Sequence, residues 1–233
     1  MIKFLPYLLF FTSTVVLAQL PKSLVEPSER VTMFDDYNGS IFTSSSFKDA
    51  SVIHEKSGTF DTKLRYNIYL DILEYKSQDE LYHVTKSPTV HARIDGDYFY
   101  YCDFVNQRGL ERKGYYVLVQ MNENYSIYKK FTLKITEPES ASRIMTSTPE
   151  PGRLKTIRTY YLEENGVIME LSLDKSEILA TLEDHGDALK KYMKSEKIKL
   201  KKEEDLIQFV AKYNALKNSE DSSNRSLIVN KSN

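Results

Sequence analysis

Residues 90–105 read VHARIDGDYFYYCDFV, and this stretch decides the fold class. Its dipeptide Asp95-Gly96 separates a run at 90–94, in which apolar and polar side chains alternate, from an aromatic-rich run at 97–105. Because this dipeptide suits the positive backbone angles of a type I′ turn, the stretch predicts a β-hairpin. Asn165-Gly166 predicts a second hairpin, between runs at 154–162 and 167–173.

The same period of two continues on both sides of these hairpins, with turn residues between the runs. Further strands are predicted at 51–55, 59–69, 72–76, 80–85, 115–121 and 125–135. Connections this short favour neighbouring antiparallel strands. The sequence therefore predicts a mainly β protein, an antiparallel meander that forms a sandwich or a barrel-like sheet.

After Leu173 the apolar residues follow a helical spacing. Asp174 is a candidate N-cap for a first helix, and Gly186 is expected to end it. Two more helices are predicted at 188–195 and 202–216. Helices this short are marginal alone, so we expect them to dock on the sheet.

The first residues have the pattern of a secretory signal peptide, with Lys3, an apolar run over 4–17 and a small-residue cleavage site at Val16-Leu17-Ala18. The alternative is a membrane anchor, but the run is shorter than the roughly 20 residues that a bilayer requires. We expect an exported protein, periplasmic, outer-membrane-associated or secreted, with no transmembrane segment after cleavage. The expected organisation is a signal peptide at 1–18, an extended segment at 19–39, an antiparallel β-domain at 40–173, a helical segment of the same domain at 174–217 and a disordered tail at 218–233.

Composition narrows the class of function. The 233 residues contain 32 Lys plus Arg and 33 Asp plus Glu, a formal charge of -1, which excludes a nucleic-acid binder driven by global charge. Cys102 is the only cysteine, so no intramolecular disulfide can form. Its place among aromatic residues predicts a buried structural thiol rather than a nucleophile.

Several short motifs carry a resemblance to a known family. They are Asn38-Gly39-Ser40, Leu64-Arg65-Tyr66-Asn67-Ile68-Tyr69, Gly114-Tyr115-Tyr116-Val117-Leu118, Tyr128-Lys129-Lys130, Ala188-Leu189-Lys190-Lys191-Tyr192 and Lys201-Lys202-Glu203-Glu204-Asp205-Leu206. On these motifs the chain resembles an uncharacterised family of exported bacterial β-rich proteins of unknown function. The resemblance implies a β-rich domain with a helical C-terminal piece and a location in the cell envelope, and it brings no catalytic residues.

No recognised catalytic or cofactor motif is present, and we expect no cofactor. The one set to consider for a metal is His83, His91, Asp95 and Asp97, if a neighbouring strand brings His83 close to the others. The spacing is not a ligand pattern and Arg93 shares the row, so we expect no metal site.

Two surfaces are weak candidates for binding. The aromatic face bearing Phe99 and Tyr101 could stack a flat ligand, although tyrosine-rich strands more often reflect packing between neighbours. A lysine run could contact an anionic lipid or polysaccharide, although a solvated helix face balanced by the acids at 203–205 also explains it. Its members are Lys190, Lys191, Lys194, Lys197, Lys199, Lys201 and Lys202.

Two functional hypotheses follow. The first is an exported, non-enzymatic binding or structural protein of the bacterial envelope, whose partner is another envelope component or a small ligand. The second is a secreted hydrolase or lyase with a site of scattered residues such as His83, His91, Asp97 and Asp103. Convergent carboxylates or imidazoles in a deep polar pocket would favour the enzyme.

Overall fold

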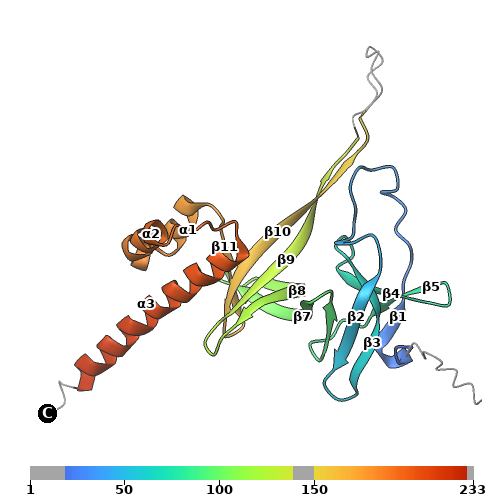
Figure 1. Ribbon diagram of the computed structural model, residues 1–233. Helices are drawn as coiled ribbons and strands as arrows, with labels where there is room; N and C mark the ends of the chain where they lie inside the picture. Colours follow the sequence, from blue (N-terminus) through green and yellow to red (C-terminus); the bar gives the residue numbers. More distant parts are fainter. Residues whose placement is uncertain (1–18, 139–149, 230–233) are drawn as a thin grey trace, which may run out of the picture.

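The computed structural model describes residues 19–138 and 150–229, leaving aside the side chains of 183 and 220–229. The predicted signal peptide at 1–18 lies outside the described residues. One continuous sheet of eleven strands dominates the fold (Figure 1). The strands are β1 Val25–Pro27, β2 Lys48–His54, β3 Gly58–Asn67, β4 Ile72–Ser77, β5 Glu80–Val84, β6 Val90–Ile94, β7 Asp97–Asn106, β8 Glu111–Met121, β9 Ser126–Thr136, β10 Arg153–Glu164 and β11 Val167–Leu171.

The strand order is β1-β5-β4-β3-β2-β6-β7-β11-β10-β9-β8, and every pair is antiparallel except β7 with β11. Strand β7 also pairs with β8, so β7, β8, β9, β10 and β11 close into a ring. The ring interior contains Phe104, Tyr116, Tyr128 and Ile168, with Tyr161 packed against them. Each of the five strands thus supplies at least one side chain, which confirms the mainly β prediction and makes this half a small barrel.

Both predicted hairpin tips are confirmed by backbone angles. Asp95 and Gly96 have φ of 50° and 93°, and Asn165 and Gly166 have φ of 52° and 82°. Two successive positive φ values are the signature of a type I′ turn. The two dipeptides therefore fix the registers of β6 with β7 and of β10 with β11.

The other half of the sheet, β1 to β6, has a core of its own. Leu64, Tyr66, Leu73 and Phe99 are buried there, together with Tyr115 from the barrel strand β8. The segment at 19–39 is less extended than expected, because it forms a 3-10 helix at Lys22–Leu24 before β1. It is also part of the core, since Leu20 and Leu24 are buried against the sheet.

The helices are α1 Lys175–Thr181, the 3-10 helix η2 Glu183–His185, α2 Gly186–Ser195 and α3 Glu203–Val229. Asp174 caps α1 as predicted, its Oδ1 accepting hydrogen bonds from Ser176 N at 2.8 Å and Glu177 N at 3.1 Å. Gly186 does not end the first helix, which stops at Thr181; it begins α2 instead. A local turn at Leu182 therefore ends α1 before the glycine is reached.

Docking of the helices on the sheet is confirmed. Their core comprises Ile178, Leu182, Leu189, Met193, Leu200, Leu206, Phe209 and Val210, which pack with Ile127, Tyr160, Leu162 and Leu171 of the barrel strands. The prediction of a disordered tail is wrong as far as Val229, because α3 continues through residues 218–229, which contain neither Gly nor Pro to stop it. Among the described residues, no helix is both long enough and apolar enough to cross a membrane.

Strands β9 and β10 extend beyond the barrel as a twisted two-stranded ribbon (Figure 1). Their pairing runs from Ser126↔Glu163 to Thr136↔Arg153. The pairing of β8 with β9 ends at Lys129, and the pairing of β11 with β10 ends at Tyr160, so the rest of the two strands has no further neighbour in the sheet. One face of the ribbon is covered, because Leu133 and Leu154 pack against Phe34 and Ile41. We call residues 130–136 and 153–159 the ribbon.

Candidate functional site

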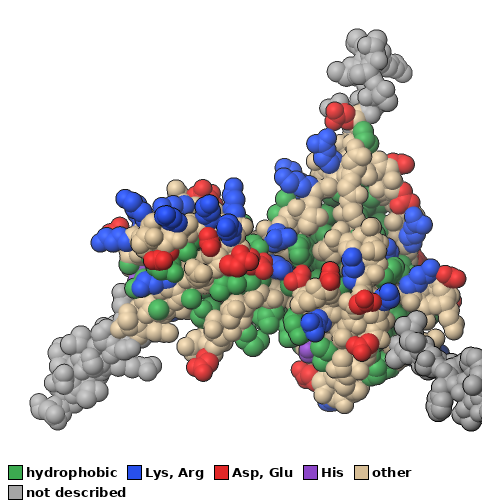
Figure 2. Space-filling model, viewed as in Figure 1, with side chains coloured by type: hydrophobic (Ala, Val, Ile, Leu, Met, Phe, Trp, Pro, Cys, Tyr) green, Lys and Arg blue, Asp and Glu red, His purple; other side chains and the backbone are tan. Residues whose placement is uncertain are grey.

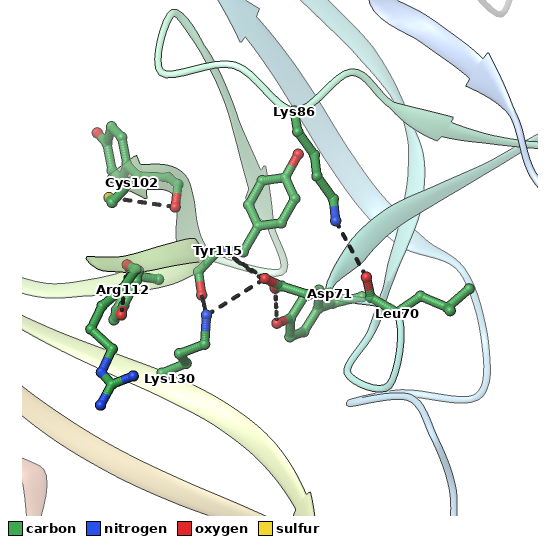
Figure 3. A network of polar contacts seen from close by, with 10 residues as sticks. Leu70, Asp71, Lys86, Cys102, Arg112, Tyr115 and Lys130 are labelled. Atoms are coloured by element: carbon green, nitrogen blue, oxygen red, sulfur yellow. Dashed lines mark hydrogen bonds and ion pairs between the residues drawn. The ribbon is translucent and has the colours of Figure 1, made fainter. Parts of the chain in front are cut away.

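A polar network joins the two halves of the molecule around Asp71 (Figure 3). Asp71 accepts a hydrogen bond from the Tyr66 hydroxyl at 2.6 Å, and both of its oxygens lie 3.2 Å from Tyr115 N. Lys130 Nζ lies 3.5 Å from Asp71 Oδ2 and also donates to the Tyr115 carbonyl at 3.5 Å. The carboxylate is thus surrounded by donors from β3, β8 and β9.

Gly114 makes this network possible. Its φ of 141° is rarely adopted by other residues, and a Cβ there would lie 2.2 Å from Lys130 Nζ and 2.3 Å from Asp71 Oδ2. Burial lowers the pKa of Lys130, although Asp71 opposes this effect, and burial raises the pKa of Tyr66. The donors of the network are therefore satisfied by the Asp71 carboxylate, and the carboxylate by these donors. Such an arrangement is typical of a structural junction rather than a reaction centre.

A second buried charge pair has the same character. Arg65 donates to Glu74 Oε2 from Nε at 2.7 Å, and Asn67 Nδ2 donates to Glu74 Oε1 at 2.7 Å. The guanidinium of Arg65 also lies 3.8 Å from the ring centroid of Phe42. The Leu64-Arg65-Tyr66-Asn67 motif is therefore accounted for by packing and by these two networks.

Cys102 is half-buried, so it is less enclosed than the buried thiol that the sequence predicts. It packs beside Tyr100 and the barrel interior, and its Sγ lies 3.6 Å from the Tyr100 carbonyl. Burial raises the pKa of the thiol to about 12. A thiol that stays protonated at neutral pH is a poor nucleophile.

The expectation of an exposed aromatic face at Phe99 and Tyr101 is wrong. Phe99 is only 3% exposed, and Tyr101 packs against the same core with its ring edge-on to Tyr115. Strand β7 belongs to both halves of the sheet, so one face lies in the barrel and the other in the open-sheet core. Alternation along one strand could not reveal that both of its faces are covered.

The four residues considered for a metal do not come together. Strands β5 and β6, which hold His83 and His91, are separated in the sheet by β4, β3 and β2. His83 Nε2 lies 3.5 Å from Glu26, and the His91 ring stacks on Tyr100 at 4.7 Å. Asp95 belongs to a hairpin turn.

Asp97 and Asp103, the carboxylates of the enzyme hypothesis, are also apart. Asp97 is paired with Lys129 at 3.1 Å, whereas Asp103 is half-exposed and paired with Lys113 at 3.3 Å. Within the described part of the chain, no three His, Cys, Asp or Glu residues gather as metal ligands would. The scattered residues of the enzyme hypothesis are thus not assembled into a site.

Two hollows in the described part of the chain are considered as sites. A groove of about 1180 Å³ runs over β2, β3 and β4, with Phe60 and Tyr75 beside three acidic and three basic side chains. The acids are Asp49, Asp61 and Asp95, and the bases are Lys63, Lys76 and Arg93. A second hollow, of about 780 Å³, lies among the helices beside Lys175, Asp184 and Lys190. Neither shows the convergent polar groups that mark an active site.

The lysine run is the outstanding charged feature of the surface. All seven lysines are exposed, and no carboxylate of the described residues lies within ion-pair distance of any of them. Figure 2 shows their surroundings as a concentration of blue side chains over the helices. Elsewhere, Lys63, Lys76 and Lys113 each have an acidic partner.

The acids that follow the run are engaged in structural contacts. Glu203 lies 3.4 Å from Lys129 Nζ and accepts a hydrogen bond from the Tyr160 hydroxyl at 2.9 Å. Asp205 accepts one from the backbone N of Lys199 at 2.8 Å. Two of the three acids at 203–205 therefore serve the fold, whereas Glu196 within the run and Glu204 after it are exposed.

A second cationic position lies on the ribbon and is not predicted by any pattern in the sequence. Lys134 lies directly opposite Lys155, on the face away from the packed Leu133 and Leu154. Both lysines are exposed. The alternation of polar and apolar residues placed each of them on a wet face, but only the register of β9 with β10 pairs them.

No protein-family model, curated protein or solved structure matches the chain.

Proposed function

We propose that this protein is an exported, non-enzymatic binding protein of the bacterial envelope that holds an anionic partner on its lysine run. The observation that carries the proposal is the set of seven exposed lysines with no carboxylate partner among the described residues. The chain has a formal charge of -1, so whole-molecule attraction to anions would not explain such binding. A local surface would have to provide it.

Export is the second part of the proposal, and it is supported by Lys3, the apolar run at 4–17 and Val16-Leu17-Ala18. N-terminal sequencing of the protein from the envelope fraction tests it, with Gln19 as the expected first residue. Recovery of the exported form with Met1 in place would contradict it.

Binding is tested with charge-removal variants of the full mature chain. Each lysine near an anionic surface contributes about 1 kcal/mol, so Lys190→Gln, Lys191→Gln and Lys194→Gln together should weaken binding about a hundredfold. The probes are phosphatidylglycerol vesicles and alginate, with phosphatidylcholine vesicles and dextran as uncharged counterparts.

The matched control removes the same charge elsewhere. Lys63→Gln, Lys76→Gln and Lys113→Gln together eliminate three exposed lysines that have acidic partners on the sheet. This variant should bind the anionic probes like the wild type. Equal loss in both triple variants would show that net charge, rather than the lysine run, is responsible.

A further inference from the structure

The first residue of the expected mature chain lines the groove over β2, β3 and β4. Gln19 follows the predicted cleavage site at Val16-Leu17-Ala18 and is exposed. The next residue, Leu20, is only 5% exposed and packs in the core of the half formed by β1 to β6, as Leu24 does. Removal of the signal peptide would therefore leave one residue outside this core, and that residue is a glutamine.

The neighbours of Gln19 in the groove are engaged with one another. Asp49 lies 3.4 Å from Lys63 Nζ, and Asp61 Oδ1 accepts a hydrogen bond from the Ser51 hydroxyl at 2.7 Å. Among the described residues, no hydrogen bond or ion pair involves Gln19. Its side-chain amide is therefore free to turn toward its own backbone nitrogen.

An N-terminal glutamine carries a nucleophile and an electrophile in one residue. The α-amine attacks the side-chain amide carbon, Cδ, and closes a five-membered lactam. The bond from Cδ to the amide nitrogen breaks, and that nitrogen leaves as ammonia with the proton that the α-amine gives up. The reaction is favoured because it is intramolecular, and with a pKa of about 8 roughly a tenth of a terminal amine is unprotonated at pH 7 and able to attack. The step needs no oxidant, reductant or second substrate.

We infer that Gln19 is a modification site, so that the mature chain begins with 5-oxoproline. This inference rests on the export that the proposed function includes, and it goes beyond that function by naming a covalent change. The lactam has no charge at neutral pH and leaves no free amine for an aminopeptidase to bind. Because Leu20 follows directly and is buried, the fold also shields the first peptide bond of the mature chain. The terminus is thus closed both by its chemistry and by its position.

The test uses the full-length protein with its own signal peptide, expressed in a bacterium and purified from the envelope fraction. The mass of the intact, undigested protein should equal that of residues 19–233 less one ammonia. The matched control is Gln19→Asn, which keeps an exposed amide but is one methylene shorter, so that closure would require a strained four-membered ring. This variant should have the mass of the unmodified chain.

Fragment masses then locate the loss of ammonia. Stepwise sequencing from the amine would be blocked by the ring, so the N-terminal peptide is read by mass spectrometry. This reading separates Gln19 from Asn38 and Asn165, each of which precedes a glycine and can lose ammonia by forming a succinimide. The loss should lie in the peptide 19–22.

A peptidase that removes N-terminal 5-oxoproline tests the shielding by the fold. The unshielded substrate is a synthetic peptide of residues 19–27 that begins with the same ring. The enzyme should act on the native protein at least about tenfold more slowly, because Leu20 must leave the core before its peptide bond can enter an active site.

The results that would overturn the inference differ in what else they overturn. A mature chain that begins at Gln19 with a free amine, or one that begins at another residue, refutes the modification and leaves export standing. Recovery of the exported form with Met1 in place overturns both. Equal loss of ammonia from Gln19→Asn would place the reaction elsewhere in the chain. Equal rates of ring removal from the protein and from the peptide would refute the shielding by Leu20.

Discussion

Replacing Asp71 with Asn tests whether the junction of the two halves depends on a buried charge. Asp71 has a φ of 53°, a conformation that Asn adopts as readily as Asp, so the backbone is not strained by the change. Asn can still accept from the Tyr66 hydroxyl and Tyr115 N, and the shape of the side chain is kept. What is lost is the negative charge beside Lys130.

The magnitude follows from the environment of the pair. The side chains of Lys130 and Asp71 are 17% and 26% exposed, and Lys130 also contacts the Tyr115 carbonyl and the Tyr116 ring. Leaving one partner of a fully buried pair uncompensated costs about 3 to 5 kcal/mol. Allowing for the partial exposure, we expect a loss of about 2 to 3 kcal/mol.

Equilibrium unfolding in urea measures this loss. With a slope of about 2 kcal/mol per molar urea, the midpoint should fall by about 1 to 1.5 M. The matched control is Asp79→Asn, because Asp79 also has a positive φ, 68°, and also pairs with a lysine, Lys76 at 2.8 Å, but at an exposed turn. That variant should unfold at the wild-type midpoint, since exposed ion pairs contribute little.

Two outcomes would refute the reasoning. If Asp71→Asn and Asp79→Asn have the same midpoint, the junction does not depend on the charge of Asp71. If Lys130→Met added to Asp71→Asn lowers the midpoint further by its full single-variant amount, the two side chains act independently. Coupling between them predicts that the double variant loses less than the sum.

Three other predictions concern stability. Truncation after Leu173 removes the helical side chains that cover Ile127 and Leu162 and should give an insoluble or molten product, whereas truncation after Lys217 keeps them and should melt like the full chain. Gly114→Ala should lower the free energy of unfolding, measured in urea, by more than about 1 kcal/mol, because its backbone has a positive φ and its Cβ would collide with Lys130 and Asp71. Gly58→Ala should lower it by less, because Gly58 also has a positive φ but has open space around it. Cys102 should be inert to a thiol reagent at pH 8 until the protein unfolds. Because its pKa is raised to about 12 in the folded state, the contribution of this thiol to stability should be lost as the pH rises from about 9 toward 12. Far-ultraviolet circular dichroism measures this loss, and Cys102→Ala should remove the part of the pH dependence that is due to the thiol.

The sequence alone determined the local structure of this protein. Period-two alternation located the predicted strands, Asp95-Gly96 and Asn165-Gly166 placed two turns with positive φ, and Asp174 marked the start of α1. Each of these features depends on residues close together in the chain, because backbone angles and capping bonds are set within a few positions. The position of Cys102 among aromatic side chains was readable for the same reason.

Only the tertiary structure decided which strands meet. The parallel contact of β7 with β11 closes the barrel and places β7 between two cores, which buries Phe99 and covers part of Tyr101. The strand order also separates His83 from His91 and sets Lys134 opposite Lys155. The lysine run was visible in the sequence. That Glu203 pairs with Lys129 and accepts a hydrogen bond from Tyr160, instead of pairing with a lysine of the run, was not, because those two residues are far away in the chain. Such pairings depend on long-range register and on which faces become covered, and a single sequence does not encode these in any short pattern.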